Sequence, residues 1–125
     1  VRGWEGEKIG FLWIDGDHTY PMVKKDLELW WPHVIDGGVV AFHDSTCEGV
    51  KQLMNEFLRA GNITAAGLTD SITYAVKKTG ASSSFRSRYI LFLINLHDVL
   101  RSIPGTEWLR SKCKGFVKSL IRLSQ

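Results

Sequence analysis

One segment near the start of the chain reads Ile9-Gly10-Phe11-Leu12-Trp13-Ile14-Asp15-Gly16-Asp17-His18-Thr19-Tyr20. Residues 9–14 form a short apolar run, which is typical of a strand buried on both faces, and the run then breaks into two carboxylates, a glycine and an imidazole. In an open parallel sheet, ligands bind in the crevice beyond the carboxyl ends of the strands. The segment therefore predicts a strand whose exit turn faces a ligand or substrate.

A second segment repeats this pattern and reads Gly37-Gly38-Val39-Val40-Ala41-Phe42-His43-Asp44-Ser45. Its apolar run, residues 39–42, predicts another strand that delivers a histidine and an aspartate at its end. If the two strands lie side by side, five polar side chains should converge on one edge of the sheet: Asp15, Asp17, His18, His43 and Asp44. This edge is the predicted functional site.

The segment between the two strands predicts a helix. Thr19 is placed to cap it, and Pro21 falls in the first turn, where a missing N–H costs nothing. Apolar residues then recur at steps of three and four as far as Val34, and Gly37 and Gly38 end the segment.

The next segment predicts a second helix followed by a hairpin. Residues 45–48 match the S-x-x-E capping box, an apolar stripe follows, and Gly61 is a natural stop. Ile63–Leu68 and Ile72–Lys77 are predicted strands joined by a tight turn. Alternation of strand and helix up to this point favours a parallel sheet with helices packed on it.

Residues 81–125 are a different kind of sequence. They hold eight Lys and Arg against two Asp and Glu, whereas residues 1–80 hold eight against eleven. The pattern predicts a linker over 80–84, a helix over 85–103 and a last amphipathic, basic helix capped by Thr106. We therefore expect a domain over residues 1–80 and a basic helical tail. Three roles stay open for the tail: contact with a membrane surface, binding of a partner or a second copy of the chain, and packing on its own domain.

Length and composition set the broad class. A chain of 125 residues with 44% hydrophobic residues suits one globular domain that buries a core. No apolar run approaches the roughly 18 residues of a membrane-spanning helix, and the first eight residues lack the apolar segment of a signal peptide. We therefore expect a cytoplasmic protein, and we expect no nucleic-acid partner.

These residues resemble the carboxy-terminal half of a class I S-adenosylmethionine-dependent methyltransferase. The likeness is to small-molecule O-methyltransferases whose fourth strand ends in I-D-G-D-H-x-Y and whose fifth carries G-G-x-x-x-F-H-D, here residues 14–20 and 37–44. It covers roughly residues 9–78. The resemblance implies an α/β fold with a Rossmann-like parallel sheet and a terminal antiparallel hairpin, with C-terminal helices added here. It also implies an enzyme that methylates a hydroxyl group of a small molecule or a sugar.

The resemblance implies contacts with S-adenosyl-L-methionine at Asp15, Gly16 and Asp17. Members of the family normally carry a glycine-rich turn that cradles this cofactor on an earlier strand, and the sequence contains no G-x-G-x-x-G. Val1 also stands directly ahead of a central type of strand. We therefore expect the sequence to be part of a longer domain.

The resemblance to metal-dependent members of the family implies a divalent cation bound by Asp15, His43 and Asp44, and it places the family's basic residue on His18. The imidazole at position 43 departs from the oxygen-only pattern of these enzymes. Mn²⁺, Fe²⁺ and Zn²⁺ therefore stay open beside Mg²⁺.

A hydroxyl acceptor is a poor nucleophile at neutral pH, so its proton must be removed for methyl transfer. A cation held by Asp15 and Asp44 would lower the pKa of the acceptor. Alternatively, His18 would act as general base, because an imidazole titrates near the working pH. We take His18 and Asp15 as the candidate catalytic residues, while Asp17 and Asp44 also suit a structural role as helix caps.

Two other functions stay open from the sequence. The pattern Asp-x-Asp-His followed by His-Asp also resembles the ligand set of a metal-dependent hydrolase acting on phosphoesters, although such sites usually need further ligands and only His33 and His97 remain. The other alternative is a non-catalytic, truncated methyltransferase module that forms homo-oligomers through its C-terminal helices.

Overall fold

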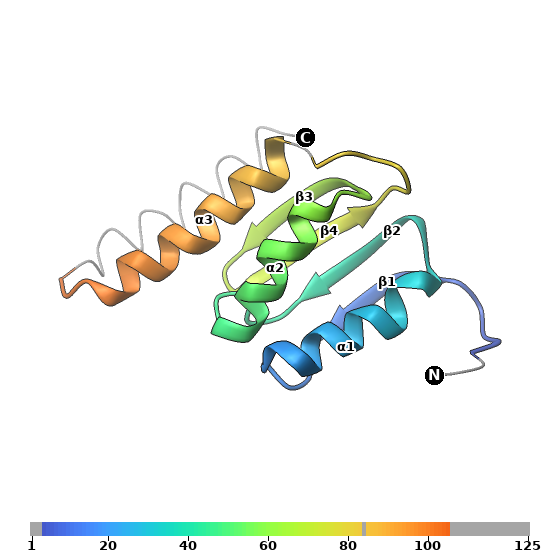
Figure 1. Ribbon diagram of the computed structural model, residues 1–125, viewed down its shortest axis with the longest axis horizontal. Coiled ribbons are helices and arrows are strands. Elements are labelled where there is room, and N and C mark those ends of the chain that lie inside the picture. Colours follow the sequence, from blue (N-terminus) through green and yellow to red (C-terminus); the bar gives the residue numbers. More distant parts are fainter. Residues whose placement is uncertain (1–3, 84, 106–125) are drawn as a thin grey trace.

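The computed structural model describes residues 4–83 and 85–105 of the chain. Its elements follow in the order β1 (Ile9–Ile14), α1 (Tyr20–Trp30), the short 3-10 helix η1 (Trp31–His33), β2 (Val34–Phe42), α2 (Glu48–Ala60), β3 (Ile63–Thr69), β4 (Ile72–Lys77) and α3 (Phe85–Ser102) (Figure 1). The predicted alternation of strand and helix, followed by a hairpin, is confirmed.

The strands form one four-stranded sheet in the order β1-β2-β4-β3. β1 and β2 are parallel, while β4 runs antiparallel to both β2 and β3. Because α1 connects β1 to its parallel neighbour, this half of the sheet is a βαβ unit. The expected α/β fold, a partial Rossmann-like sheet that ends in an antiparallel hairpin, is confirmed.

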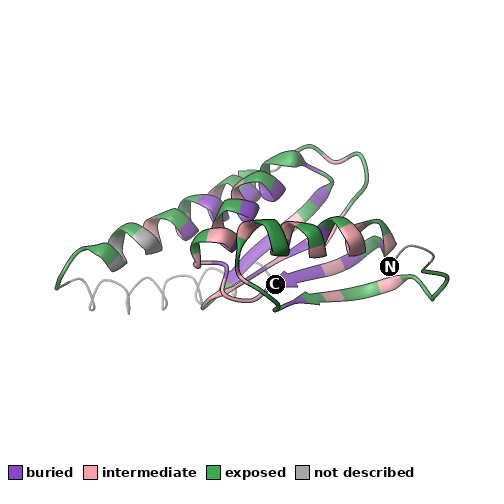
Figure 2. Cartoon of the chain, turned by 60° about the horizontal axis from the view of Figure 1, so that its bottom comes forward, coloured by how far each residue is buried: buried purple, intermediate pink, exposed green. Residues whose placement is uncertain are grey.

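The hydrophobic core lies between the sheet and the helices. α1 and α2 lie side by side over the sheet, and α3 packs beside α2 against β3 (Figure 1). Figure 2 shows the buried residues gathered where the strands and helices face one another. The predicted apolar stripe of α2 is buried in full, at Val50, Leu53, Met54, Phe57 and Leu58. Gly61, with φ of +85°, ends this helix as expected.

The expectation that β1 is buried on both faces is wrong for the described residues. Ile14 is buried toward α1 and α2, but Phe11 and Trp13 are 60% and 44% exposed. Side chains alternate across a strand, and the described helices pack on one face of the sheet. The other face of β1 therefore presents aromatic rings to solvent. The rings of Phe11 and Trp13 are stacked, with their centroids 6.5 Å apart.

The second strand begins earlier than the sequence predicts. Val34, expected in the helical stripe, is instead the first residue of β2 and pairs with Ile9. α1 ends at Trp30, two residues before Pro32, which cannot continue an α-helix and lies in η1. Lys77 Nζ donates hydrogen bonds to the carbonyls of Trp31 (2.9 Å) and Val34 (2.8 Å). This lysine ties the start of β2 to the end of β4.

α3 packs on the same core through Ile90, Leu91 and Ile94 and ends at Ser102, near the predicted boundary. The last predicted helix, which begins after Thr106, lies outside the described residues. The division of the chain at residue 80 and the role of the tail stay predictions.

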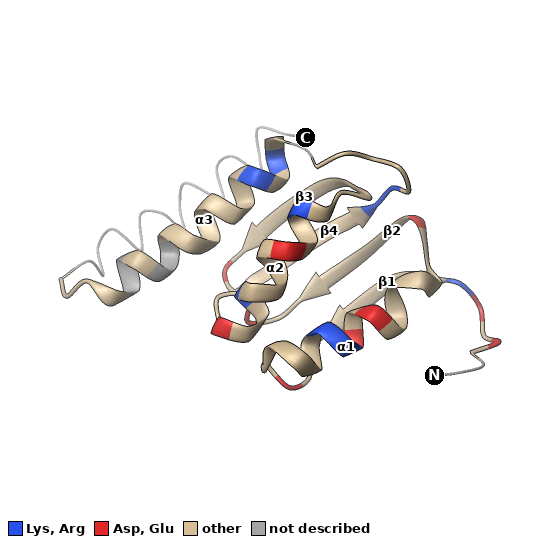
Figure 3. Ribbon diagram, in the orientation of Figure 1, with Lys and Arg blue, Asp and Glu red and all other residues tan. Residues whose placement is uncertain are grey.

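Charged residues of the described part lie mainly on the helices, in the loops and at strand ends (Figure 3). Among the described helices, none combines the length and the apolar character that crossing a bilayer requires.

Candidate functional site

The carboxyl ends of β1 and β2 are direct neighbours. Ile14 pairs with Phe42 at the last position of the parallel ladder, and the backbone N–H of His43 donates to the carbonyl of Ile14 at 3.0 Å. Asp15 and His43 therefore leave the sheet side by side. The proposition that the two strand ends share one edge is confirmed in this geometry.

Four of the five predicted side chains meet at this edge. His43 Nδ1 lies 3.1 Å from Asp15 Oδ1 and 3.4 Å from Asp44 Oδ2. His18 Nε2 lies 3.9 Å from Asp15 Oδ1 and 3.8 Å from Asp44 Oδ2. We call this group, Asp15, His18, His43 and Asp44, the His/Asp cluster.

The two imidazole nitrogens of the His/Asp cluster are screened from solvent. Neither His18 Nε2 nor His43 Nδ1 makes a hydrogen bond with any described residue, although carboxylate oxygens lie nearby. A buried polar atom without a hydrogen bond costs about 1–3 kcal/mol. The four side chains remain between 35% and 43% exposed, so the cluster is reachable from outside although these two atoms are covered.

Asp44 is held in a backbone conformation that few residues adopt. Its φ is +47°, in the left-handed region, where aspartate and asparagine are tolerated better than most side chains. The carbonyl of Asp44 accepts a hydrogen bond from the N–H of Cys47 at 2.8 Å, which closes the turn into α2. Backbone conformations of this kind gather at functional sites, where the surrounding structure holds them.

A buried network beneath this turn fixes it to the hairpin. Ser45 Oγ donates to the carbonyl of Ser71 at 2.8 Å and accepts from Thr73 Oγ1 at 2.7 Å, and Ser45 and Thr73 are fully buried. The expected capping box is therefore wrong, because α2 begins at Glu48 with Cys47 as its N-cap and Ser45 serves the network instead. Serines and threonines here follow no motif, so sequence reasoning had no signal for this support.

Trp13 orients the Asp15 carboxylate through a hydrogen bond. The indole Nε1–H of Trp13 donates to Asp15 Oδ2 at 3.4 Å, which leaves Oδ1 toward the histidines. The Trp13 ring also lies 5.9 Å from the ring of His43. The apolar run over residues 9–14 predicts that Trp13 is buried in the sheet, so this role of its indole N–H could not be predicted from the pattern.

Asp17 turns away to a structural task. Its Oδ1 accepts a hydrogen bond from the backbone N–H of Thr19 at 2.7 Å, and this bond lowers the pKa of the Asp17 carboxyl. Thr19 is the N-cap residue of α1, as predicted, but its own side chain makes no capping bond. Asp17 therefore organises the start of α1, and it does not join the His/Asp cluster.

Gly49 lets α2 approach the backbone that carries His18. A Cβ built on Gly49 would overlap the carbonyl oxygen of His18 and the backbone nitrogen of Tyr20. A residue with a side chain at position 49 would push these two segments apart. The glycine therefore allows the close contact that brings His18 near Asp44.

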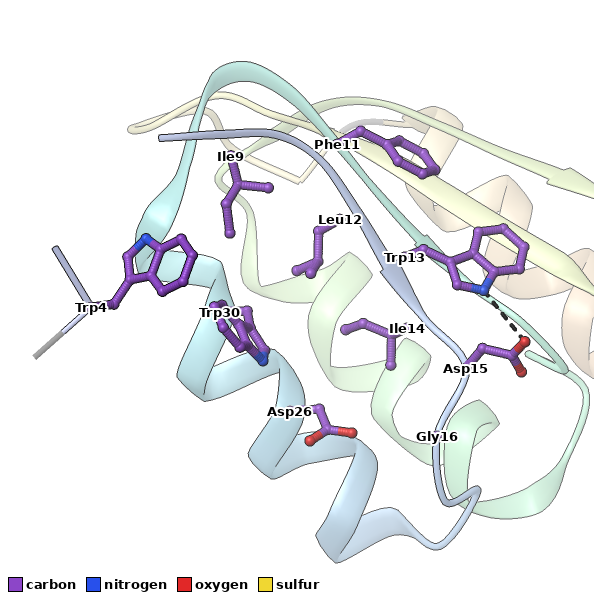
Figure 4. Close-up of a pocket in the computed structure, with 10 residues that line it drawn as sticks. All are labelled: Trp4, Ile9, Phe11, Leu12, Trp13, Ile14, Asp15, Gly16, Asp26 and Trp30. Atoms are coloured by element: carbon purple, nitrogen blue, oxygen red, sulfur yellow. Dashed lines mark hydrogen bonds between the residues drawn. The ribbon is translucent and has the colours of Figure 1, made fainter. Parts of the chain in front are cut away.

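An open groove runs along β1 and ends at Asp15 and Gly16 (Figure 4). Trp4 and Trp30 line its far end, where their ring centroids lie 5.4 Å apart in an edge-to-face contact. Ile9 and Leu12 also line the groove. The groove thus joins an apolar, aromatic surface to one carboxylate of the His/Asp cluster. Two of the three residues predicted to contact a cofactor, Asp15 and Gly16, line it, whereas Asp17 does not.

The His/Asp cluster has the donor atoms of a cation site. One ligand atom from each of Asp15, His18 and His43 lies within 4.8 Å of the others. Imidazole nitrogens and carboxylate oxygens are ligands for divalent transition metals. The donor set and its two covered, unbonded nitrogens therefore fit a divalent cation.

The first part of the chain matches a known protein-family model. Residues 1–45 match a family model described as a methyltransferase domain. A search of curated proteins found no match to the chain. The matched residues comprise β1, α1, β2 and all four side chains of the His/Asp cluster. The match supports a methyltransferase domain, and with it a transferase, in the part of the chain that carries the candidate site.

Proposed function

We propose that this protein takes part in S-adenosylmethionine-dependent methylation of a hydroxyl group on a small molecule or a sugar. The observation that carries the proposal is the convergence of Asp15, His18, His43 and Asp44 at neighbouring strand ends inside the region matched to a methyltransferase domain. Methyl transfer asks the protein for alignment of the reactants, exclusion of water and removal of the acceptor proton. The cluster has groups for the last of these tasks.

Asp15, His43 and Asp44 would hold a divalent cation in this proposal. When bound, such a cation would lower the pKa of the acceptor hydroxyl. The support comes from the short separations of His43 Nδ1 from the two carboxylates, 3.1 and 3.4 Å, and from the absence of a hydrogen bond between these atoms.

His18 offers the second route to a deprotonated acceptor. Its imidazole lies next to the carboxylates of Asp15 and Asp44, and histidine is the side chain that most often serves as a general base. Asp15 and His18 thus remain the proposed catalytic residues, with the cation and the base acting together or in place of each other.

S-adenosylmethionine would bind along the groove that ends at Asp15 and Gly16. The aromatic rings of Trp4 and Trp30 provide the kind of flat apolar surface that suits a nucleoside base, and Asp15 provides a polar end. Asp17 supports the loop by fixing Thr19.

Titration calorimetry with S-adenosylhomocysteine, the product form of the cofactor, tests the proposal. We expect saturable binding and, in a second assay, transfer of a labelled methyl group from S-adenosylmethionine to a catechol or sugar acceptor. Asp15→Asn should abolish transfer. Asp36→Asn is the matched control, because Asp36 lies near the opposite end of β2 and bonds to Thr79. Absence of any binding of S-adenosylhomocysteine would refute the proposal for this chain.

The metal-dependent hydrolase is the second candidate, because the mixed His/Asp donor set would suit it as well. His33 adds nothing to that set, since it lies in η1, after the end of α1, where its ring centroid is 6.4 Å from that of Trp4 and 6.3 Å from that of Trp30. Release of nitrophenol from p-nitrophenyl phosphate in the presence of Zn²⁺ or Mn²⁺, with no binding of S-adenosylhomocysteine, would favour hydrolysis over methyl transfer.

A further inference from the structure

We infer that His18 is a fourth ligand of the cation, so that the centre consists of two imidazoles and two carboxylates and prefers a transition metal ion to Mg²⁺. The inference extends the cation site of the proposed function. Cation binding can nevertheless be measured without a methyl donor or an acceptor, so the two stand or fall separately.

The nitrogen–oxygen separations of the His/Asp cluster match the spacing of ligands around one cation. Two atoms that each lie about 2.1 Å from a cation are about 3.0 Å apart at a right angle and about 4.2 Å apart on opposite sides. The four nitrogen–oxygen separations of the cluster run from 3.1 to 3.9 Å. Those of His18 Nε2 fall inside this interval, as do those of His43 Nδ1.

The covering of His18 Nε2 favours a ligand over a free base. A general base must bring its nitrogen within hydrogen-bond reach of the acceptor proton. His18 Nε2 is screened from solvent and faces Asp15 and Asp44, and it makes no hydrogen bond with the described residues. His43 Nδ1 is covered in the same way. Two covered nitrogens thus face the same two carboxylate oxygens, and a cation between these four atoms would contact all of them.

The surroundings of Asp15 match those of a metal ligand. Carboxylates that bind metals are usually held by a hydrogen bond to the oxygen that does not face the metal. Trp13 Nε1 supplies such a bond to Asp15 Oδ2, while Oδ1 faces His18 and His43.

The donor set decides which ions the centre prefers. Mg²⁺ prefers oxygen ligands and retains several waters, whereas imidazole nitrogens suit Zn²⁺, Fe²⁺ and Co²⁺. With two imidazoles in the set, the centre should favour these ions. With His18 engaged as a ligand, it would no longer serve as the general base, so that of the two proposed routes to a deprotonated acceptor the cation would remain.

Calorimetric titration of the full chain with ZnCl₂ and with MgCl₂ tests the inference. We expect Zn²⁺ to bind at least about tenfold more tightly than Mg²⁺. His18→Ala should weaken Zn²⁺ binding by about 10- to 100-fold, at least as much as loss of a supporting group does. His33→Ala, in η1, should leave Zn²⁺ binding unchanged. Substitution with Co²⁺ should give a visible absorption spectrum that changes in His18→Ala and not in His33→Ala.

Imidazole ¹⁵N resonances of the wild-type protein give a readout that does not depend on a variant folding. Addition of Zn²⁺ should shift His18 Nε2 and His43 Nδ1 together. Zn²⁺ binding that leaves His18 Nε2 unshifted, equal affinity for Zn²⁺ in His18→Ala, tighter binding of Mg²⁺ than of Zn²⁺, or no binding of either ion would each overturn the inference. Metal binding as described here, with no binding of S-adenosylhomocysteine, would refute methyl transfer alone.

Discussion

A methyl group added at Gly49 should destabilise this protein, although Gly49 lies in the first turn of α2. Glycine is a poor helix former, so replacement by alanine in an unhindered helix usually stabilises by about 0.5–1 kcal/mol. At Gly49 the new Cβ would overlap the backbone of His18 and Tyr20. Backbone atoms cannot rotate away as the end of a flexible side chain can, so the start of α1 must move.

The two effects can be compared in magnitude. Overpacking of a close contact costs about 1–3 kcal/mol, and the gain in helix propensity offsets up to about 1 kcal/mol of that. We therefore expect Gly49→Ala to lower the free energy of unfolding by up to about 2 kcal/mol. The sign is the sharper result, because helix propensity alone predicts the opposite sign.

Urea denaturation followed by circular dichroism measures the change. Gly10→Ala is the matched control, because a Cβ on Gly10 meets nothing within 4 Å and the residue lies within β1. That variant should be as stable as the wild type or slightly more stable. Gly49→Ala should also bind Zn²⁺ more weakly, since His18 moves with its backbone. A Gly49→Ala protein more stable than the wild type would show that the backbone of His18 and Tyr20 does not limit the size of residue 49.

Two further substitutions test other contacts of the fold. Thr73→Val removes the buried hydrogen bond to Ser45 Oγ and should lower the free energy of unfolding, measured by urea denaturation, by about 1 kcal/mol. An unchanged urea midpoint would show that the network beneath Asp44 contributes nothing to stability. The hydroxyl of Tyr20 donates a hydrogen bond to Glu56, and this bond lowers the pKa of the Glu56 carboxyl. Tyr20→Phe removes that hydroxyl. The wild-type protein should be more stable than Tyr20→Phe near pH 7. The difference in the free energy of unfolding should shrink as the pH falls below about 4.5, the ordinary pKa of Glu56, because the Glu56 carboxylate then loses its charge. A difference that grows in acid would contradict this assignment.

Much of the fold could be predicted because the local signals agree with one another. Apolar runs with turn residues at their ends predicted the strands, and the buried stripe of α2 followed from its spacing of three and four. The start of β2 could not be predicted, since Val34 continues the helical pattern of α1, and only long-range contacts, its pairing with Ile9 and the hydrogen bond from Lys77, assign it to the sheet. Tertiary contacts overrode the local pattern there.

The sequence pattern predicts which residues form the candidate site better than it predicts how their side chains are arranged. Polar residues at the ends of two apolar runs predicted that Asp15 and His43 would meet, and the strand pairing brings them together. The direction of His18 depends on the fit of Gly49 against its backbone, which spacing along the chain does not encode. The capping box at Ser45 was wrong for a similar reason, because Thr73 and Ser71 are distant in sequence and engage its hydroxyl first.

Anomalous diffraction from crystals soaked in Zn²⁺ tests most directly whether the two strand ends form one centre. We expect a single strong peak bonded at about 2.0–2.2 Å to four atoms: Asp15 Oδ1, Asp44 Oδ2, His43 Nδ1 and His18 Nε2. A peak bound elsewhere, or Asp15 and Asp44 too far apart to share one ion, would contradict it.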